Sequence, residues 1–219
     1  MSVRPPPPSA SIAAPLEGEK MFAPSADRNS ADICELIQSL VSPKTHALEI
    51  ASGTGQHISA LATAMPDVHW HPTDVDSARL ASISAYTQEL GLTNIAGPIF
   101  LDATAAGWGA SMPAVDLVLL TNLLHLISAG ECRTLILEAA QALSPGGTLM
   151  LYGPFKRSGV LTSDGDARFD ADLRASDPNI GYKDDLDMRT WLSDAGFARV
   201  AVNQMPANNL AFVARSTSS

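Results

Sequence analysis

Short apolar segments alternate with amphipathic segments along most of this chain, and this alternation restricts its possible folds more than any other feature. The clearest apolar run is V-D-L-V-L-L-T-N at 115–122, nearly continuous, as expected for a strand buried on both faces. The clearest amphipathic segment, 28–41, repeats apolar residues at the helical intervals of three and four. Alternation of this kind predicts a parallel sheet with helices on both faces.

The remaining segments follow the same rhythm. Further strands are expected at 47–51, 68–74, 95–102 and 148–152, and the last two, 197–202 and 210–214, flank a turn as an antiparallel pair. Further helices are expected after the glycine-containing loop at 53–55, after an N-cap at Asp76, over 130–143, and before Gly196. The predicted fold class is therefore α/β: a Rossmann-like, doubly wound, mostly parallel seven-stranded sheet with an antiparallel last strand.

Two segments interrupt this pattern. Residues 1–20 are rich in Pro, Ser and Ala, which is typical of a flexible arm, so one folded domain is expected over 21–219. Residues 153–186 scatter Pro and Gly among many Asp and Arg residues. A connection this long inside a compact domain is usually a lid or a binding loop, so we expect a lid-like insertion there.

Composition and charge narrow the classes of partner. The chain carries 14 basic against 23 acidic residues, a net charge of −9, and so has no overall attraction to nucleic acid or anionic lipid. No apolar run approaches the length of a membrane span, and no Cys–His metal spacing is present. We expect a cytoplasmic protein that acts on a small molecule without a metal, and a homodimer stays open.

The first expected strand runs into E-I-A-S-G-T-G-Q-H at 49–57. Gly53 and Gly55 allow the backbone of this loop to approach a ligand closely. Glu49 would repel the pyrophosphate of a dinucleotide, but it would attract an ammonium or sulfonium group. The loop therefore favours a cationic ligand over a phosphate.

Acids also end two neighbouring strands. Asp74 lies 21 residues after Gly53, the spacing from which an acid accepts hydrogen bonds from ribose hydroxyls. Asp102, at the end of the third strand, suits the exocyclic amine of adenine. S-adenosylmethionine carries an ammonium, a sulfonium and no phosphate, so it fits this set of acids.

The chain resembles class I S-adenosylmethionine-dependent methyltransferases over residues 28–214. The resemblance is carried by E-I-A-S-G-T-G, T-D-V-D and L-S-P-G-G-T-L-M-L, and it departs from the family at Ala51 and Ser52. A closer likeness is to the methyltransferase-like protein 26 family. It rests on A-D-R-N (26–29), E-I-A-S-G-T-G-Q-H (49–57), N-L-L-H (122–125), Y-G-P-F (152–155), R-F-D (168–170), D-P (177–178) and M-P-A-N-N (205–209).

The resemblance implies S-adenosyl-L-methionine as cofactor and S-adenosyl-L-homocysteine as product. It implies cofactor contacts from Glu49, Gly53, Gly55 and Asp74, with Asp102 beside them. Arg28 and Asn29 begin the helix before the first strand, from where they would reach the carboxylate of the cofactor. Arg28 equally fits a surface salt bridge.

Methyl transfer is an in-line displacement that mainly requires positioning and exclusion of water, so few catalytic residues are needed. Asn122 follows the fourth strand and is a candidate to orient the acceptor or to bind the methionine end of the cofactor. His125 is a candidate base, although L-L-H-L-I equally fits a packed histidine. Tyr152, at the end of the fifth strand, is the third candidate.

Acceptor binding is expected from aromatic and amide side chains and from the insertion. The aromatic candidates, which also fit an ordinary core, are Phe22, Tyr152, Phe155, Phe169 and Tyr182. Arg168 belongs to a basic group, with Lys156, Arg157, Arg174 and Lys183, that either binds an anionic acceptor or pairs with nearby Asp residues. Asn208 and Asn209 lie in a turn, which Asn favours for backbone reasons, and the resemblance suggests that they face the site.

Three functions remain in competition. The first is methyl transfer to an O, N or S atom of a small molecule. The second is a non-catalytic module that binds cofactor or partner on the same fold, with the Pro-rich arm as its interaction element. The third, a nicotinamide-dependent reductase, is disfavoured by Glu49 and by the absence of a third glycine at Ile58.

Overall fold

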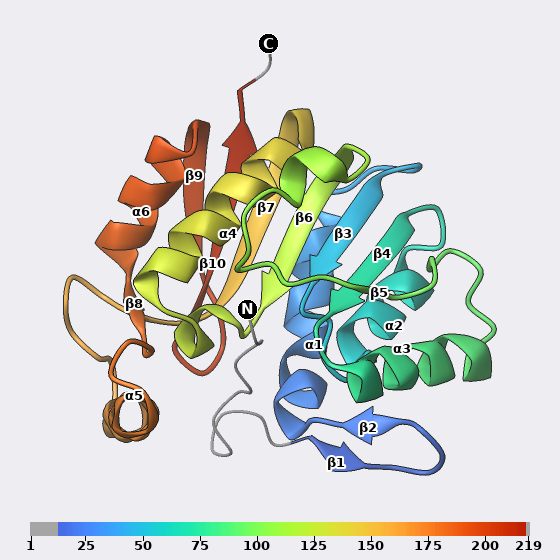
Figure 1. The fold of residues 1–219 in the computed structure, drawn as a ribbon, viewed down its shortest axis with the longest axis horizontal. Helices are drawn as coiled ribbons and strands as arrows, with labels where there is room; N and C mark the ends of the chain where they lie inside the picture. The colour runs from blue at the N-terminus through green and yellow to red at the C-terminus, as the bar shows by residue number, and fades with distance from the viewer. Residues whose placement is uncertain (1–12, 218–219) are drawn as a thin grey trace.

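The computed structural model describes residues 13–217, and a twisted sheet runs through the middle of the molecule (Figure 1). Within these residues the strand order along the sheet is β5-β4-β3-β6-β7-β10-β9, with a short β8 paired to β7. The main strands are β3 (His46–Ile50), β4 (His69–Asp74), β5 (Ile99–Phe100), β6 (Val115–Thr121), β7 (Leu143–Lys156), β8 (Lys183–Asp184), β9 (Phe197–Gln204) and β10 (Asn209–Ser216).

Strands β3 to β7 pair in parallel, whereas β10 runs antiparallel to both β7 and β9. The helices are α1 (Pro24–Gln38), α2 (Gln56–Ala64), α3 (Ser77–Glu89), α4 (Ala129–Ala142), α5 (Asp164–Ser176) and α6 (Asp185–Asp194), with short 3₁₀ turns at Gly109–Ser111 and Leu124–Leu126. The Rossmann-like α/β fold with an antiparallel last strand is therefore confirmed.

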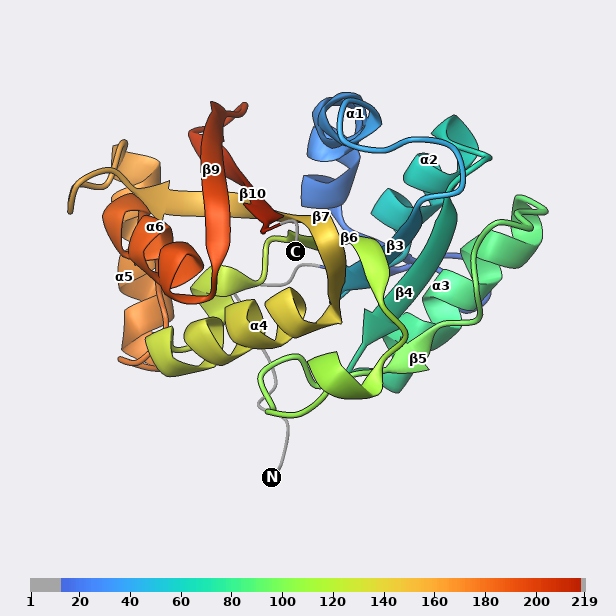
Figure 2. The same ribbon diagram turned by 90° about the horizontal axis from the view of Figure 1, so that it is seen from above.

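Two apolar layers hold the helices to the sheet, and β6 shows how one strand serves both. Val118 and Leu120 pack towards α4 and α6, while Leu117 and Leu119 pack towards α1, α2 and α3. All four side chains are buried, because alternate residues of a strand point to opposite faces. Figure 2 shows α1 and α2 on one side of the sheet and α4 on the other.

Some expected boundaries move. The third strand is paired only at β5, and its earlier part keeps a single bridge between Ile95 and Trp70, since Gly97 and Pro98 interrupt it. Strand β7 begins at Leu143, so it includes the S-P-G-G segment expected as a turn, and the pairing register shifts there.

The insertion and the arm also differ from expectation. Residues 153–156 continue β7, and the rest of 153–186 contains α5 and β8, so the insertion has its own regular structure. Strand β1 (Ala14–Pro15) pairs with β2 (Met21–Phe22), so ordered structure begins before Met21. Of the flexible arm expected over residues 1–20, residues 1–12 lie outside the described residues.

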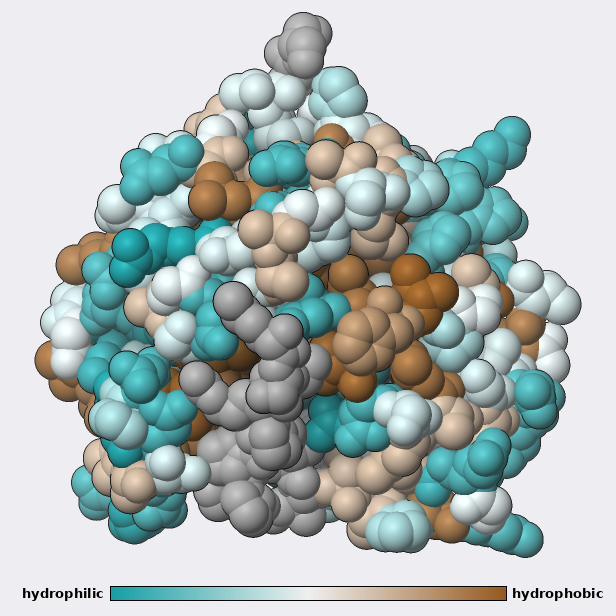
Figure 3. Space-filling view, viewed as in Figure 1, coloured by the Kyte–Doolittle hydropathy of each residue, from teal (hydrophilic) through white to brown (hydrophobic). Residues whose placement is uncertain are grey.

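The surface seen in Figure 3 mixes polar and apolar side chains, with apolar ones gathered near the middle of this face. Among the helices of residues 13–217, none combines the length and the hydropathy needed to cross a membrane.

A buried carboxylate organises the loop between β5 and β6. Glu138 on α4 accepts hydrogen bonds from the backbone N–H groups of Gly107 (2.8 Å) and Gly109 (2.7 Å). Gly109 passes so close to α4 that an added Cβ would lie 2.1 Å from the Glu138 carbonyl oxygen. Glu138 therefore fixes the segment that leads into β6.

We expect Glu138→Ala to lower the free energy of unfolding by about 2 kcal/mol, because the buried N–H of Gly109 and the part-buried N–H of Gly107 both lose their side-chain acceptor. Urea unfolding measures this change. Leu137→Ala is the matched control on the next residue of the same helix, where the side chain is 48% exposed and should contribute less than about 1 kcal/mol. Equal losses in the two variants would contradict this role for Glu138.

Candidate functional site

A pocket opens where β3 and β6 end, at the carboxyl edge of the sheet. It is lined by the loop after β3, the start of α1 and the residues after β6. The lining residues are Ala13, Ala23, Ser25, Ala26, Ala51, Ser52, Gly53, Thr54, His57, Arg79, Thr121, Asn122, Leu123 and Leu126. Of the residues expected to bind cofactor, Gly53 and Asn122 lie on this wall.

The loop after β3 needs backbone conformations that favour glycine. Gly53 (φ 61°) and Gly55 (φ 91°) both have left-handed backbone. A Cβ on Gly55 would lie 2.9 Å from the Ile83 Cα, so this glycine also allows α3 to pack closely against the loop. Ala51, one of the departures from the family pattern, adopts a positive φ of 53° at the same turn.

Glu49 lies behind this loop and is buried almost completely, at 1% exposed. Its Oε2 atom has no hydrogen-bond partner in the part of the chain that the structure describes. Burial raises the pKa of the Glu49 carboxyl to about 8, against the effect of the nearby Ser52 side chain, and Asp74 raises it further. The site therefore holds a carboxylic acid whose ionised form lacks a positive partner.

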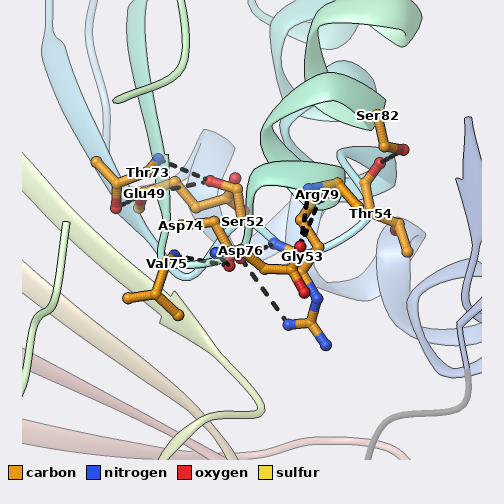
Figure 4. A network of polar contacts seen from close by, with 11 residues as sticks. Glu49, Ser52, Gly53, Thr54, Thr73, Asp74, Val75, Asp76, Arg79 and Ser82 are labelled. Atoms are coloured by element: carbon orange, nitrogen blue, oxygen red, sulfur yellow. Dashed lines mark hydrogen bonds and ion pairs between the residues drawn. The ribbon is translucent and has the colours of Figure 1, made fainter. Parts of the chain in front are cut away.

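Asp74 connects the end of β4 to the glycine loop, as Figure 4 shows. Its Oδ2 atom accepts a hydrogen bond from the Gly53 N–H (2.9 Å), and its Oδ1 atom accepts from Val75 (2.8 Å) and Asp76 (3.0 Å). Arg79 Nη1 lies 3.9 Å from Oδ2. Burial raises the pKa of Asp74, and Arg79 and these N–H groups oppose that rise. Asp74 thus stabilises the loop that lines the pocket.

The two residues after the loop tie it to α1. Gln56 Oε1 accepts hydrogen bonds from the Ala23 backbone N–H (2.6 Å) and from the Thr54 hydroxyl (2.9 Å). His57 lies with its Nε2 atom 2.7 Å from the Asn29 side chain. These contacts explain why the start of α1 forms part of the pocket wall.

The hairpin of β1 and β2 is attached to α3, and the residues next to it, Ala13 and Ala23, line the pocket. The Met21 N–H donates to Ser82 Oγ (2.8 Å), and the Tyr86 hydroxyl donates to the Met21 carbonyl (3.1 Å). Lys20 forms an ion pair with Glu89 at the end of α3. The hairpin is therefore attached to the domain and is part of the site's surroundings.

Two neutral polar groups face the pocket after β6. Thr121 Oγ1 is buried and has no hydrogen-bond partner among residues 13–217. Asn122 has a left-handed backbone (φ 57°), a conformation that Asn tolerates better than most residues, and its N–H donates to the Tyr152 carbonyl (2.9 Å). The Thr121 hydroxyl without a partner and the left-handed backbone of Asn122 indicate that a polar group of a ligand binds at this end of the pocket.

His125 lies one turn beyond this wall, and its ring is buried beside two aromatic rings of the insertion. The ring centroids of Phe169 and Tyr182 lie 5.6 Å and 6.2 Å away. Burial, and the nearby charge of Lys183, lower the pKa of His125 to about 3. His125 does not line the pocket, although its neighbour Leu126 does. Its Nδ1 atom lacks a partner in the described chain.

Most basic side chains of the insertion form ion pairs or hydrogen bonds with other groups of the protein. Arg174 pairs with Asp170 (2.8 Å), and Lys183 Nζ donates to the carbonyls of Ile127 (2.6 Å) and Gly181 (2.8 Å). Arg157 donates to the carbonyls of Phe155 and Asn208 and to the Gln204 side chain. Arg168 is exposed on α5. These contacts favour the structural interpretation of the basic group.

The turn between β9 and β10 also makes local contacts. Asn208 Nδ2 donates to Asp166 on α5 (3.2 Å), and Asn209 Nδ2 donates to the Pro206 carbonyl (3.0 Å). Tyr152 is buried, and its hydroxyl lies near the Asn29 and Asn209 side chains, which favour its ionised form. Burial raises the pKa of the Tyr152 hydroxyl, so it stays protonated.

Four further candidates lie off the pocket wall. Phe155 packs in the core against Phe212, with ring centroids 4.9 Å apart. Phe22 is half-buried in the hairpin, and Arg28 is exposed on α1. Asp102 accepts hydrogen bonds from the N–H (3.0 Å) and the hydroxyl (2.6 Å) of Thr104.

Sequence reasoning assigned no role to several residues in or beside the pocket. Gln56 and His57 stood in a quoted motif without a role, and Asn29 was expected only to reach the carboxylate of the cofactor. Only the fold shows that α1 crosses the glycine loop at these positions. No sequence motif pointed to Thr121 or Arg79 as pocket residues; only their positions, at the end of a strand and near the start of a helix, could have suggested them. Within residues 13–217, no group of three or more His, Cys, Asp or Glu side chains is arranged to hold a metal ion.

A family model matches nearly the whole chain, at residues 20–216. That family is described as "Protein of unknown function (DUF938)".

Solved structures show the same fold. One is the S-adenosylmethionine-dependent methyltransferase SibL in its apo form, at a TM-score of 0.73 and 20% identity, covering 88% of this chain and 56% of that one. A putative O-methyltransferase from Nostoc punctiforme matches at a TM-score of 0.73 and 22% identity, covering 87% and 57%. An O-methyltransferase family 2 protein from Planctomyces limnophilus, in complex with apigenin, matches at 0.76 and 17%, covering 88% and 58%.

This chain thus spans just over half the length of these proteins. At such identities the comparison establishes the Rossmann-like fold that S-adenosylmethionine-dependent methyltransferases share.

The raised pKa of Glu49 predicts how stability depends on pH. Between the ordinary pKa of 4.5 and about 8, the folded protein holds a proton that the unfolded chain releases. The contribution of Glu49 to stability is therefore greatest below its ordinary pKa and falls as pH rises through that range, by up to about 1.4 kcal/mol for each pH unit.

Glu49→Gln removes this dependence, so the variant should match the wild type near pH 5 and exceed it in melting temperature near pH 8. Thermal unfolding of the cofactor-free proteins at both pH values measures the difference. Glu35→Gln, at an exposed position of α1, is the control and should show no such trend. A Glu49→Gln variant that is less stable than the wild type at pH 8 would contradict the assignment.

Proposed function

We propose that this chain, which belongs to the DUF938 family of proteins of unknown function, is an S-adenosylmethionine-dependent methyltransferase that acts on a small molecule. The proposal is carried by one observation: Glu49 is buried directly behind a glycine loop, and its Oε2 atom has no hydrogen-bond partner among residues 13–217. An ammonium or sulfonium group would stabilise the ionised form of this carboxyl, whereas a pyrophosphate would repel that form. The fold shared with known methyltransferases supports the same cofactor.

The residues on the pocket wall and directly behind it fit this cofactor in kind. Glu49 provides the negative charge, and Gly53 allows close approach of the backbone. Asp74 fixes the loop, and its Oδ2 atom, which accepts one hydrogen bond, keeps a second lone pair for a ribose hydroxyl. Bound S-adenosylmethionine would supply an activated methyl group. Asp102 remains our candidate for the adenine amine, because it follows β5 at the same edge of the sheet.

Transfer requires that the acceptor atom be held in line with the methyl group and kept from water. We assign Asn122 to this orientation, because its amide lines the pocket at the end of β6. His125 is our candidate base: its depressed pKa keeps it neutral, and its Nδ1 atom is unpaired among the described residues. Movement of Phe169 on α5 would bring an acceptor within reach of this ring.

The acceptor that suits this site is neutral. Arg174, Lys183 and Arg157 are engaged in internal contacts, so the insertion offers few free cations. The aromatic rings of Phe169 and Tyr182 and the hydroxyl of Tyr152 favour an acceptor with an apolar body and one polar group. The likeness of the quoted motifs to methyltransferase-like protein 26 belongs to this proposal and names no acceptor.

The competing function is a module that binds cofactor without chemistry. The burial of His125 beside Phe169 favours it, since the candidate base is not yet exposed to an acceptor. A screen for S-adenosylhomocysteine formation across phenols, amines and thiols separates the two functions. Product above the enzyme-free rate with any acceptor class excludes the module.

Calorimetry with S-adenosylmethionine tests the cofactor site. We expect Glu49→Gln to weaken binding by roughly tenfold or more, because the cation loses a buried counter-charge. Asp74→Asn should also weaken binding, in part by loosening the loop at Gly53. Glu35→Gln is the matched control and should bind as the wild type does. Unchanged affinity in both pocket variants, or preferential binding of NADH, would overturn the assignment.

A further inference from the structure

His57, two residues after Gly55, has one ring nitrogen with a hydrogen-bond partner and one without a partner among residues 13–217. His57 is the second residue of α2, it is 8% exposed, and it lines the pocket. Its Nε2 atom lies 2.7 Å from the Asn29 amide. The amide satisfies all its neighbours when its nitrogen faces His57, because that nitrogen then also donates to the carbonyls of Ser25 (2.8 Å) and Ala26 (3.0 Å).

This contact fixes the tautomer of the imidazole. A ring nitrogen that accepts a hydrogen bond carries no proton, so neutral His57 keeps its proton on Nδ1. Burial lowers the pKa of His57 to about 4, so the neutral form persists at neutral pH. His57 is therefore an oriented N–H donor and carries no charge.

The Nδ1 proton has no acceptor in the part of the chain that the structure describes. Nothing in residues 13–217 accepts a hydrogen bond from it, and Nδ1 is not among the polar atoms that are sealed away without a partner. Because the ring lines the pocket, this proton is available to a ligand there.

We propose that His57 donates its Nδ1 proton to the carboxylate at the amino-acid end of S-adenosylmethionine, and so makes the site specific for a cofactor that carries that carboxylate. This inference rests on the proposed function. His57 lies in the first turn of α2, where the helix dipole favours an anion, whereas Glu49 behind the same loop favours a cation. An amino-acid end carries both charges, so the two residues match its two groups.

Gln56 and Asn29 are positioning residues for this contact. Helix α1 has no side-chain cap at Ala23, and Gln56 instead holds the Ala23 N–H and the Thr54 hydroxyl together. The first turn of α1 is thereby fixed against the loop, with Ser25 and Ala26 on the pocket wall. Asn29, one turn further along, then sets the orientation of the imidazole.

Two substitutions separate the two ring nitrogens. His57→Asn keeps an amide nitrogen near the position of Nδ1 and loses the contact with Asn29. His57→Gln keeps an acceptor near the position of Nε2, for Asn29, and loses the donor at Nδ1. Calorimetry with S-adenosylmethionine and with its decarboxylated form, which lacks only the carboxylate, measures the preference for the carboxylate.

We expect the wild type to prefer S-adenosylmethionine by about tenfold or more, the size of one hydrogen bond to a charged group. His57→Asn should keep most of this preference, and His57→Gln should reduce it to within about threefold of unity. Glu35→Gln, at an exposed position of α1, is the control and should keep the full preference. Arg28→Ala tests the other candidate for the carboxylate on the same helix, and it should also keep the preference if His57 makes the contact.

Each result decides between named outcomes. Loss of the preference in Arg28→Ala, or its retention in His57→Gln, overturns the role of His57 while leaving the cofactor site intact. A wild type that binds neither sulfonium overturns the proposed function itself. If His57→Gln does not fold, Asn29→Ala carries the test, because it releases the tautomer and should lower the preference; an unchanged preference there contradicts the inference.

Discussion

Parallel pairing of β3 with both β4 and β6 is the constraint from which the site follows. Glu49 is paired in register with Pro72 on one side and Leu119 on the other, so the carboxyl ends of all three strands reach the same edge. The glycine loop, Asp74 and Asn122 then meet at this edge although they are far apart in the sequence. The pocket depends on the register of the sheet, because a shift in strand pairing would move these residues apart.

The same register places an acid where the protein alone cannot stabilise its charge. Strand β3 is flanked by other strands and covered on both faces, so the Glu49 side chain has little access to water. Burial of this carboxyl lowers the stability of the folded protein, as is common for groups in functional sites. A cationic ligand would stabilise the ionised carboxylate and gain binding free energy from it, which is why Glu49 indicates the charge of the ligand.

Most of the fold could be predicted from the sequence, because apolar residues repeat at different intervals in strands and helices and β6 is an almost unbroken apolar run. The Asp76 cap was also predicted, and Asp76 accepts hydrogen bonds from the N–H groups of Ala78 and Arg79. The pairing of β1 with β2 was not predicted, because strands of two residues are too short to show a periodic pattern. In the site, spacing made Glu49 and Asp74 candidates, whereas the contact of His57 with Asn29 spans 28 positions and arises only when α1 packs against α2.

The central claim is that Glu49 is a neutral acid that becomes ionised when a cationic cofactor binds. Carbon NMR of the labelled glutamate carboxyl groups, with Glu49→Gln to assign the resonance, reports its protonation directly. The account predicts a pKa near 8 without cofactor, and an ionised carboxylate at pH 7 after S-adenosylmethionine is added. A Glu49 carboxyl already ionised at pH 7 in the cofactor-free protein, or one that stays neutral when the cofactor is bound, would contradict it.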